Sequence, residues 1–349
     1  MSAVNLPSVR RRASLREVAA ASGTSVATAS RVLNNTGYIA EATRARVMKA
    51  AAELNYQPNL RAKGLRQQSS RTVGLLIPNL LNAYYTALAD QISQLLSVAG
   101  YQLLLSSTRD DPAIEKEALG QLIGHDVDGL IWVPTAADSA LLDSLASQHI
   151  PAISVVRRVE SDRVDTVVFE DLAGAQAAVG HLVGLGHRRI AIIGGDIQYS
   201  SNAERLQGYT SALQAAGLAR DPGLIQIGVL REAWGASAMQ ALLARPDPPS
   251  AVFIASNALM PGVMRTLRAS CRVQVPRDLS LICFDDLDWF SFSEPAISAV
   301  STSHVKIAEA AVRLLLERVN HPAEIEKPPA FLKISFDLVL RGSTARPAG

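Results

Sequence analysis

The stretch TSVATASRVLNN, residues 24–35, places a single arginine among small and hydroxyl-bearing side chains. Ser25 is a favoured residue type for capping the start of a helix, here expected over residues 26–33. At 100° per residue, the apolar side of this helix holds Ala29, Val32 and Leu33. Ala27 and Arg31 fall opposite, flanked by Thr28 and Ser30. The pattern predicts a short helix that packs on one side and displays an arginine on the other.

A second short helix is expected just before it. Ser14 can cap a helix that begins at Leu15, and Glu17 lies in the first turn, where a negative charge suits the helix dipole. Gly23 then tolerates the left-handed turn that separates the two helices. A third helix follows over about residues 41–55, with Val47, Ala51 and Leu54 facing inward. Two short helices joined by a glycine turn form the helix-turn-helix pattern.

Such a helix has the groups needed to read DNA. An arginine can bond bidentately to guanine, while hydroxyls and helix N-termini hold phosphates. The charge distribution agrees: residues 1–66 hold eleven lysines and arginines against three glutamates, a net +8, which leaves −6 for residues 67–349. A basic head on an acidic body predicts a polyanionic partner for the head. A three-helix protein-binding module remains an alternative that explains the same helix pattern.

The segment LREVAAASGTSVATASRVLNNTGYIAEATRARVMKAAAELNYQPN, residues 15–59, resembles the DNA-binding head of the lactose-repressor (LacI-type) family. The resemblance implies that Val26, Ala27 and Arg31 read bases. It also implies DNA-backbone contacts for a second group of residues: Ser25, Thr28, Ser30, Asn34 and Tyr38. Two positions depart from the family pattern, Ala29 for a valine and Ala40 for a capping serine. The lost cap costs about 1 kcal/mol.

Residues 59–71, NLRAKGLRQQSSR, are basic and poor in core-forming side chains. A flexible linker would account for this composition. The family resemblance implies instead a hinge helix that folds only on DNA, with Leu65 wedged into the minor groove and Arg61 and Lys63 on phosphates. Apolar wedges of this kind unstack a base step and bend the duplex.

From residue 72 onward, apolar runs alternate with helical stretches. The expected strands cover 72–78, 101–107, 127–134, 151–156, 188–195, 250–256 and 279–286. This alternation predicts an α/β body of parallel sheets with helices on both faces. Together with the head, the predicted fold class is an all-α helix-turn-helix domain, a hinge and a two-lobed, doubly wound body.

The body also resembles the LacI-type effector domain and the periplasmic sugar-binding fold that this domain shares. The motifs that carry the resemblance are DVDGLIWVP, LGHRRIAIIGG, ERLQGY, FDDLDW and LVLRGSTA. The implied organisation is a head over residues 1–58, a hinge over 59–71, and an effector-binding and dimerisation domain over 72–345. Its lobes are expected at about 72–168 plus 299–326, and 169–298 plus 327–345.

In open parallel sheets, ligands gather at the carboxyl ends of the strands. The polar and aromatic side chains just past the expected strand ends are Tyr84, Tyr85, Arg157, Asp171, Arg205, Ser256, Asn257 and Asp285. Structural pairing of buried polar groups is the alternative role for each. By the family resemblance, Asp285 and Arg205 contact the effector. Trp289 is a further candidate for stacking on it, because Leu230 stands where many relatives carry an aromatic residue.

Two pairs depart from the family pattern: Ser256-Asn257 replaces Asn-Asp, and Glu170-Asp171 replaces Asp-Asn. The effector of a known family member therefore does not carry over to this chain. Arg157 and Arg205 suggest an acidic or phosphorylated sugar, although arginine also bonds neutral hydroxyls.

Other functions find little support in the sequence. It contains no G-x-x-x-x-G-K-[ST] loop, no H-E-x-x-H and no G-x-S-x-G elbow, and its six histidines show no ligand spacing. An enzyme, a metal site and a cofactor are therefore not expected. No run approaches a membrane span and no secretory signal precedes the head, which favours the cytoplasm and reduced Cys271 and Cys283.

These observations predict a homodimeric bacterial transcription regulator, with repression as the expected mode. Its head binds double-stranded operator DNA, and a small metabolite, a sugar or sugar derivative, binds between the lobes. Two alternatives stay open: a soluble sugar-binding protein with a vestigial head, and a DNA-bending protein with no effector.

Overall fold

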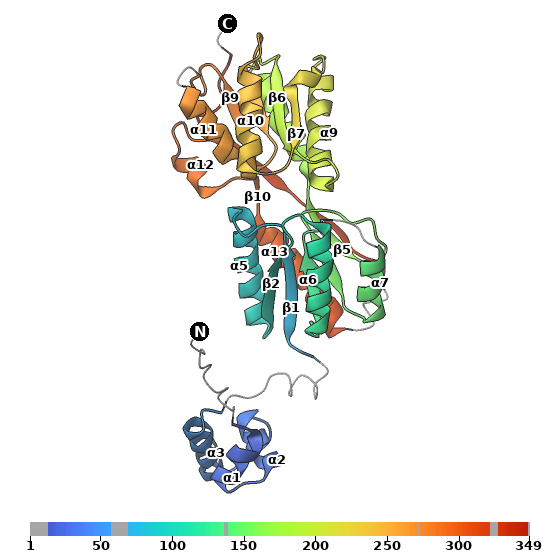
Figure 1. The fold of residues 1–349 in the computed structure, drawn as a ribbon, viewed down its shortest axis with the longest axis vertical. Helices are drawn as coiled ribbons and strands as arrows, with labels where there is room; N and C mark the ends of the chain where they lie inside the picture. The colour runs from blue at the N-terminus through green and yellow to red at the C-terminus, as the bar shows by residue number, and fades with distance from the viewer. Residues whose placement is uncertain (1–12, 57–68, 136–138, 271–272, 322–326, 348–349) are drawn as a thin grey trace, which may run out of the picture. The chain divides into compact units, whose positions relative to one another are not determined.

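The computed structural model describes residues 13–56, 69–135, 139–270, 273–321 and 327–347 (Figure 1). The chain forms two compact units, residues 1–70 and residues 71–349. We call the helical part of the first unit the head and the second unit the body, and describe each by itself.

The head contains three helices: α1 (Leu15–Ser22), α2 (Val26–Leu33) and α3 (Glu41–Glu53). Ser14 and Glu17 form a capping box, in which each side chain bonds the backbone N–H of the other residue. Gly23 ends α1 in the left-handed conformation, at φ 63°. The observed α2 has the bounds that the sequence predicts.

A small apolar core joins the three helices of the head. Val18 and Ala19 of α1 pack with Ala29 and Val32 of α2, and α3 closes the core. The residues from α3 are Val47, Ala50 and Ala51. Leu54, which was expected to face inward, instead caps the C-terminus of α3 and is 37 % exposed. The helix ends at Glu53, two residues before the expected end at about residue 55.

The body consists of two six-stranded sheets, which confirms the predicted two-lobed α/β class. The first sheet has the order β11-β5-β4-β3-β1-β2 and the second β12-β10-β9-β8-β6-β7. Every neighbouring pair is parallel except β10 and β12. The first sheet's strands are β1 (Thr72–Ile77), β2 (Gln102–Ser107), β3 (Gly129–Trp132), β4 (Ala152–Val155), β5 (Asp165–Phe169) and β11 (Phe331–Ile334). The second sheet's are β6 (Ile190–Gly195), β7 (Ile225–Gly228), β8 (Ala251–Ile254), β9 (Ser280–Phe284), β10 (Ser298–Thr302) and β12 (Phe336–Val339).

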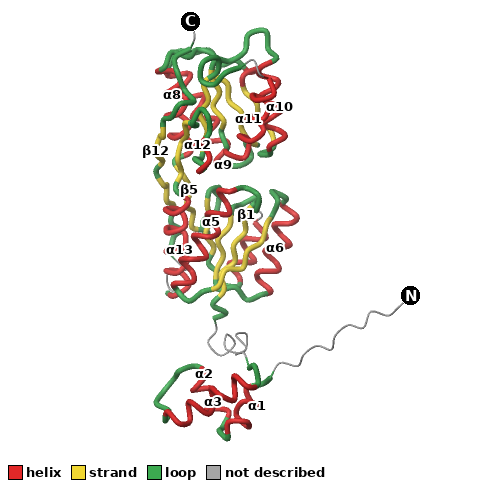
Figure 2. The backbone as a smooth tube through the Cα atoms, turned by 90° about the vertical axis from the view of Figure 1, so that its left-hand side faces the viewer, coloured by secondary structure: helices red, strands yellow, loops and turns green. Residues whose placement is uncertain are grey.

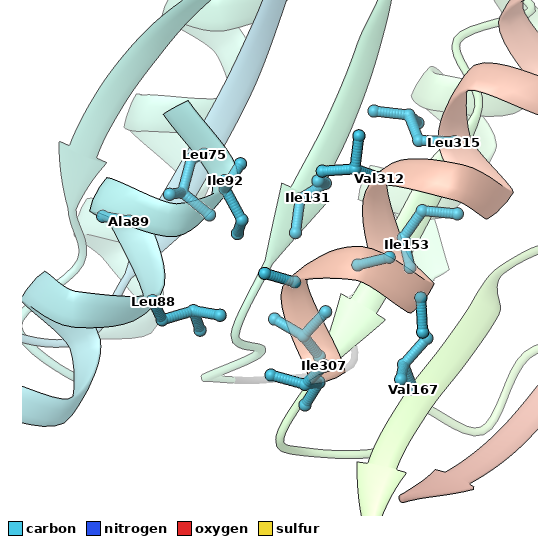
Figure 3. Close-up of a cluster of buried hydrophobic side chains, with 14 of the residues drawn as sticks. Leu75, Leu88, Ala89, Ile92, Ile131, Ile153, Val167, Ile307, Val312 and Leu315 are labelled. Atoms are coloured by element: carbon cyan, nitrogen blue, oxygen red, sulfur yellow. The ribbon is translucent and has the colours of Figure 1, made fainter. Parts of the chain in front are cut away.

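Helices cover both faces of each sheet, as Figure 2 shows. In the first lobe, α5 (Ala83–Val98) and α13 (His304–Asn320) pack on one face, and α6 (Pro112–Gly124) and α7 (Ser139–Ser147) lie on the other. Figure 3 shows the first of these layers, where Leu88 and Ile92 of α5 meet the strands beside Ile307 and Leu315 of α13. The helices of the second lobe are α8 (Asp171–Gly184), α9 (Ser200–Ala215), α10 (Glu232–Leu243), α11 (Met260–Ser270) and the short α12 (Asp288–Phe292).

The chain passes between the lobes three times: from β5 to α8, from β10 to α13 and from β11 to β12. Two expected lobe boundaries need correction. Residues 299–302 belong to the second lobe, because β10 pairs with β9, and residues 331–334 belong to the first, because β11 pairs with β5. Strand partners far apart in the sequence decide both assignments, and local composition does not reveal them.

Candidate functional site

The outer side of α2 presents the predicted base-reading residues to solvent. Val26, Ala27 and Arg31 are all exposed, whereas Ala29 and Val32 on the opposite side are buried in the head core. An exposed arginine beside a methyl group has the chemistry to contact guanine and thymine in the major groove.

The residues predicted to contact the DNA backbone flank this surface. Ser25 caps α2, accepting a bond from the Thr28 N–H at 3.1 Å, and Asn34 donates to the Ser30 carbonyl at 2.9 Å. Tyr38 is 99 % exposed, which is unusual for an aromatic side chain in a small domain. Ser25, Thr28, Ser30, Asn34 and Tyr38 therefore all lie at or near the surface. Arg61, Lys63 and Leu65 lie outside the described residues.

A cleft of about 580 Å³, counted with the part open to solvent, lies between the two lobes of the body. The lining comes from the carboxyl ends of strands in both sheets and from the first turns of α5 and α9. The lining residues are Pro78, Asn79, Asn82, Tyr84, Tyr85, Asp110, Val156, Arg157, Phe169, Ser201, Asn202, Arg205, Leu230, Ser256, Asn257, Ala258 and Asp285.

Close helix packing positions Arg205 at the cleft. Gly208, one turn further along α9, lies against the Leu172 carbonyl of α8, where any side chain would collide. This approach brings the Arg205 Nε to 2.7 Å from Asp171 Oδ1, at the start of α8. Arg205 Nη1 also donates to the Ala255 carbonyl at 2.8 Å, and the guanidinium lies over the Phe284 ring at 3.7 Å from its centroid.

Asp171 is almost completely buried beneath Arg205 and does not line the cleft. Burial raises the pKa of Asp171 to about 7, while the charge and hydrogen bond of Arg205 act in the opposite direction. Asp171 therefore positions the arginine, and the sequence expectation of direct ligand contact is corrected to this supporting role.

Asp285 follows β9 and turns its carboxylate into the cleft. Its backbone is left-handed, at φ 69°, which aspartate tolerates better than most residues. Oδ1 accepts a bond from Thr302 at 2.9 Å, and Oδ2 accepts one from Asn257 at 3.0 Å. Oδ2 also lies 3.8 Å from Arg205 Nη1. These partners fix the orientation of a carboxylate that is only 7 % exposed.

Arg157 lines the cleft from the first lobe. Its Nη1 donates to Asp110 Oδ1 at 2.6 Å and to the Pro134 carbonyl at 3.1 Å. The preceding Val156 has φ 67°, a strained value for a β-branched residue, and the Arg157 N–H donates to the Val155 carbonyl at 2.7 Å. This tight turn at the end of β4 directs the arginine toward the second lobe.

Tyr84 and Tyr85 lie in the first turn of α5, which Asn82 caps at 3.0 Å. The Tyr84 hydroxyl is buried and has no hydrogen-bond partner among the described residues. Burial, followed by the charge of Asp285, raises the pKa of Tyr84 well above its ordinary value, so the hydroxyl remains a proton donor. Buried donors are rarely left unpaired. An unpaired donor at the wall of a polar cleft indicates a place for a ligand acceptor.

Eight of the nine predicted effector residues therefore gather at the cleft, seven in its lining and Asp171 behind it. Trp289 does not: it packs edge-on against Phe290, with ring centroids 4.6 Å apart, beside the apolar core of the second lobe. Several polar lining residues were not predicted: Asn79, Asn82, Asp110, Ser201 and Asn202. Their positions in the chain could have identified them, because each lies within three residues of a strand end or at the start of a helix.

The described residues hold no group of three or more His, Cys, Asp or Glu side chains placed to hold a metal ion. Cys283 is a free, buried thiol, and Cys271 lies outside the described residues. Across the same described part of the chain, every helix is too short or too polar to cross a bilayer.

A helix-turn-helix head joined to two parallel-sheet lobes around a polar cleft defines a DNA-binding regulator of the two-lobed type. Comparisons with known proteins agree. Residues 14–59 match the model for bacterial regulatory proteins of the lacI family, and residues 179–344 match the periplasmic binding protein-like domain. The chain is 34 % identical to the HTH-type transcriptional regulator CelR of Thermobifida fusca, over 89 % of this chain and 93 % of that protein. It belongs to the lacI family of bacterial regulatory proteins, and it is a DNA-binding transcription regulator rather than an enzyme.

Other relatives extend the same picture. The ribose operon repressor of Escherichia coli is 31 % identical over 89 % of this chain and 94 % of its own length. Among solved structures, the transcriptional regulator CelR-cellobiose complex has a TM-score of 0.71 at 31 % identity and covers 95 % of this chain and 100 % of that one. The lac repressor dimer bound to operator has a TM-score of 0.84 at 25 % identity, covering 96 % and 100 %.

Proposed function

We propose that this protein is a homodimeric repressor of a near-palindromic operator. Its affinity for the operator depends on a small molecule, a sugar or sugar derivative, bound between the lobes of the body. As a regulator of bacterial genes it acts in the cytoplasm. The observation that carries the effector part is the cleft itself, where side chains of both lobes surround the buried, unpaired Tyr84 hydroxyl.

Contact with both lobes allows a bound ligand to influence DNA binding. A ligand changes an equilibrium only as far as it binds one state better than another. Because Tyr84 and Arg157 come from the first lobe and Arg205 and Asp285 from the second, a ligand that touches all four favours one lobe arrangement. A change in lobe arrangement within a dimer alters the separation of the two heads.

The dimer is part of the proposal. Helix-turn-helix dimers match two-fold operators, in which the half-sites are one or more helical turns apart. A relative, the lac repressor, has been solved as a dimer bound to operator. The exposed α2 surface with Val26, Ala27 and Arg31 is proposed to read the bases of each half-site. Arg61, Lys63 and Leu65 are proposed to contact the DNA between them.

Selection of genomic fragments by the purified full-length protein, at about 150 mM salt, tests the DNA part. Retention of fragments that share a short palindrome is the expected result. Repeating the selection with a cell metabolite extract tests the effector part, since the retained fraction should change. Specific retention that no metabolite affects would favour a DNA-bending protein without an effector. Metabolite binding without any specific retention would favour a sugar-binding protein with a vestigial head.

A further inference from the structure

The charged groups of the cleft indicate which ligand chemistry it accepts. Two guanidinium groups line it, Arg157 and Arg205. Two carboxylates line it as well, Asp110 and Asp285, and a third, Asp171, bonds Arg205 from behind. The two guanidinium charges and the two carboxylate charges of the described lining cancel, and Asp171 behind the lining adds negative charge when it is ionised.

Both arginines already have carboxylate partners. Arg157 is 3 % exposed, bonds Asp110 at 2.6 Å and has the Tyr199 ring at 3.8 Å from its guanidinium carbon. Arg205 is 5 % exposed and bonds Asp171 at 2.7 Å. Sites that bind phosphate or carboxylate offer Arg or Lys charge directly to the anion. Here an anion would enter beside carboxylates that share the same two cations, and that like-charge contact is unfavourable in a desolvated site.

Neutral hydrogen-bonding groups make up the rest of the polar lining. The Tyr84 hydroxyl is an unpaired donor. Asn82 uses its carbonyl oxygen to cap α5, and Asn202 uses its amide to bond the Asp196 carbonyl at 2.9 Å. The amide of Asn82 and the carbonyl oxygen of Asn202 thus remain as a donor and an acceptor. A hydroxyl group both donates and accepts, so several hydroxyls on one molecule match this mixture.

The aromatic side chains of the cleft are arranged edge to face. The Tyr84 ring lies at 79° to Tyr85 and at 74° to Phe169, with centroids 5.6 Å and 6.2 Å apart. On the opposite wall, Leu230 offers an aliphatic side chain. Two parallel rings that would hold a flat nucleobase by its faces do not occur among the described lining residues.

We infer that the effector is an uncharged polyhydroxylated molecule, a neutral pentose, hexose or short oligosaccharide, and that Asp110 and Asp285 disfavour sugar acids and sugar phosphates. The inference rests on the proposed function, since it concerns the same cleft. It departs from the sequence-based hint of an acidic or phosphorylated sugar, because the carboxylate partners of both arginines become visible only in the fold.

A matched ligand panel tests this inference with the full-length protein. The panel contains neutral pentoses, hexoses and disaccharides, the uronate and phosphate counterpart of each, and the purines hypoxanthine and guanine. Thermal shift identifies the binders and titration calorimetry gives their Kd. We expect a neutral sugar to bind at least about tenfold more tightly than its charged counterparts. A uronate, sugar phosphate or purine that binds most tightly would overturn the inference.

Operator binding, measured beside each titration, separates this inference from the proposed function. If a charged compound binds best and also changes operator affinity, the inference fails and the proposed function stands. If no compound in the panel binds, both fail.

A carboxylate variant adds a second, independent readout. Asp110→Asn removes a negative charge, releases Arg157 for an anion and suits the left-handed backbone at φ 57°, which asparagine also tolerates. The ratio of Kd values for a charged sugar and its neutral counterpart should fall by about tenfold in this variant. Asp90→Asn, on the exposed surface of α5, is the matched control and should leave the ratio unchanged. An unchanged ratio in Asp110→Asn would contradict the inference.

Discussion

The guanidinium carbon of Arg157, in the first lobe, lies 3.8 Å from the centre of the Tyr199 ring, in the second lobe. Beside it, the Arg158 N–H donates to the Ser200 hydroxyl at 2.7 Å, which is a second contact across the cleft. A stacked cation and a hydrogen bond at the same point stabilise this arrangement of the lobes. A ligand that repositions Arg157 would release both contacts, which connects the cleft chemistry to the lobe arrangement.

Replacing Tyr199 by alanine should loosen this contact. A cation–π pair contributes about 0.5–2 kcal/mol, depending on desolvation. We expect faster amide hydrogen exchange at Arg158 in Tyr199→Ala, by roughly 2- to 30-fold for that energy, while exchange in the sheet cores stays the same. Tyr199→Phe, which keeps the ring, should behave as the wild type. Equal protection of Arg158 in both variants would mean that the stacking does not hold the lobes.

Arg31→Ala should weaken operator binding by about 1–3 kcal/mol and relax the preference at one operator position. The reason is that Arg31 is the exposed arginine on the outer side of α2, where it can reach a base edge. Fluorescence anisotropy with the selected operator and single-base variants measures both effects. Lys49→Ala, which removes an exposed cation from α3, is the control. A uniform loss over all operator variants would reassign Arg31 to a phosphate contact.

Asp285→Asn should retain operator binding and lose effector binding by roughly 10- to 100-fold, because hydrogen bonds to a charged group contribute about 1.5–3 kcal/mol. Titration calorimetry with the effector, together with operator anisotropy, gives both quantities. Asp288→Asn, three residues further on and exposed, serves as control. Normal effector affinity in Asp285→Asn would remove this residue from the site.

Asp171 should give the body a pH-dependent stability. Its pKa, raised by burial to about 7 in the folded state, exceeds the ordinary 3.8 of an unfolded aspartate. The folded protein thus holds a proton that the unfolded chain has lost, and this contribution is full below about pH 4. It decreases as the pH rises from about 4 toward 7, and is absent above that.

Two histidines oppose this trend, since burial lowers the pKa of His181 and His187 below 6.5 and so favours folding as the pH rises. The informative quantity is therefore the difference between wild type and Asp171→Asn. Urea unfolding from pH 4 to pH 8 should show a wild-type advantage that shrinks with rising pH. A constant difference over that range would mean that Asp171 is ionised throughout.

The head was predictable in nearly every detail because its signals are local. The Ser25 cap, the Gly23 turn and the apolar side of α2 each depend on residues within one or two turns. The missed feature, exposure of Leu54, depends on where α3 ends. Helix termini are the least certain part of any sequence pattern.

The fold class of the body was predictable from the sequence, but several of its strands were not. The strands expected from the sequence do not include β5, β7, β10, β11 and β12. β7, β11 and β12 are only partly buried, so they lack the continuous apolar run of a central parallel strand. Which sheet each of β10 and β11 joins depends on partners such as β9 and β5, far away in the sequence.

The cleft was predictable where a polar side chain directly follows an apolar strand, as Arg157 and Asp285 do. Asp110 was missed because two further residues, Thr108 and Arg109, separate it from β2. Trp289 was predicted to contact the ligand because it lies close to Asp285 in the sequence, but this closeness does not determine where its side chain points. In the fold its ring packs against Phe290. The pairing of each arginine with a carboxylate required the folded chain.

The proposed function depends on control of the head's affinity for DNA by a ligand in the cleft. Its most direct test is operator affinity of the full-length protein, measured by anisotropy with and without a saturating amount of the sugar found in the ligand panel. We predict a change of at least about fivefold, the lower end of typical coupling energies, and none in Asp285→Asn. An operator affinity that is the same with and without the bound sugar in the wild type would contradict control of DNA binding by the effector.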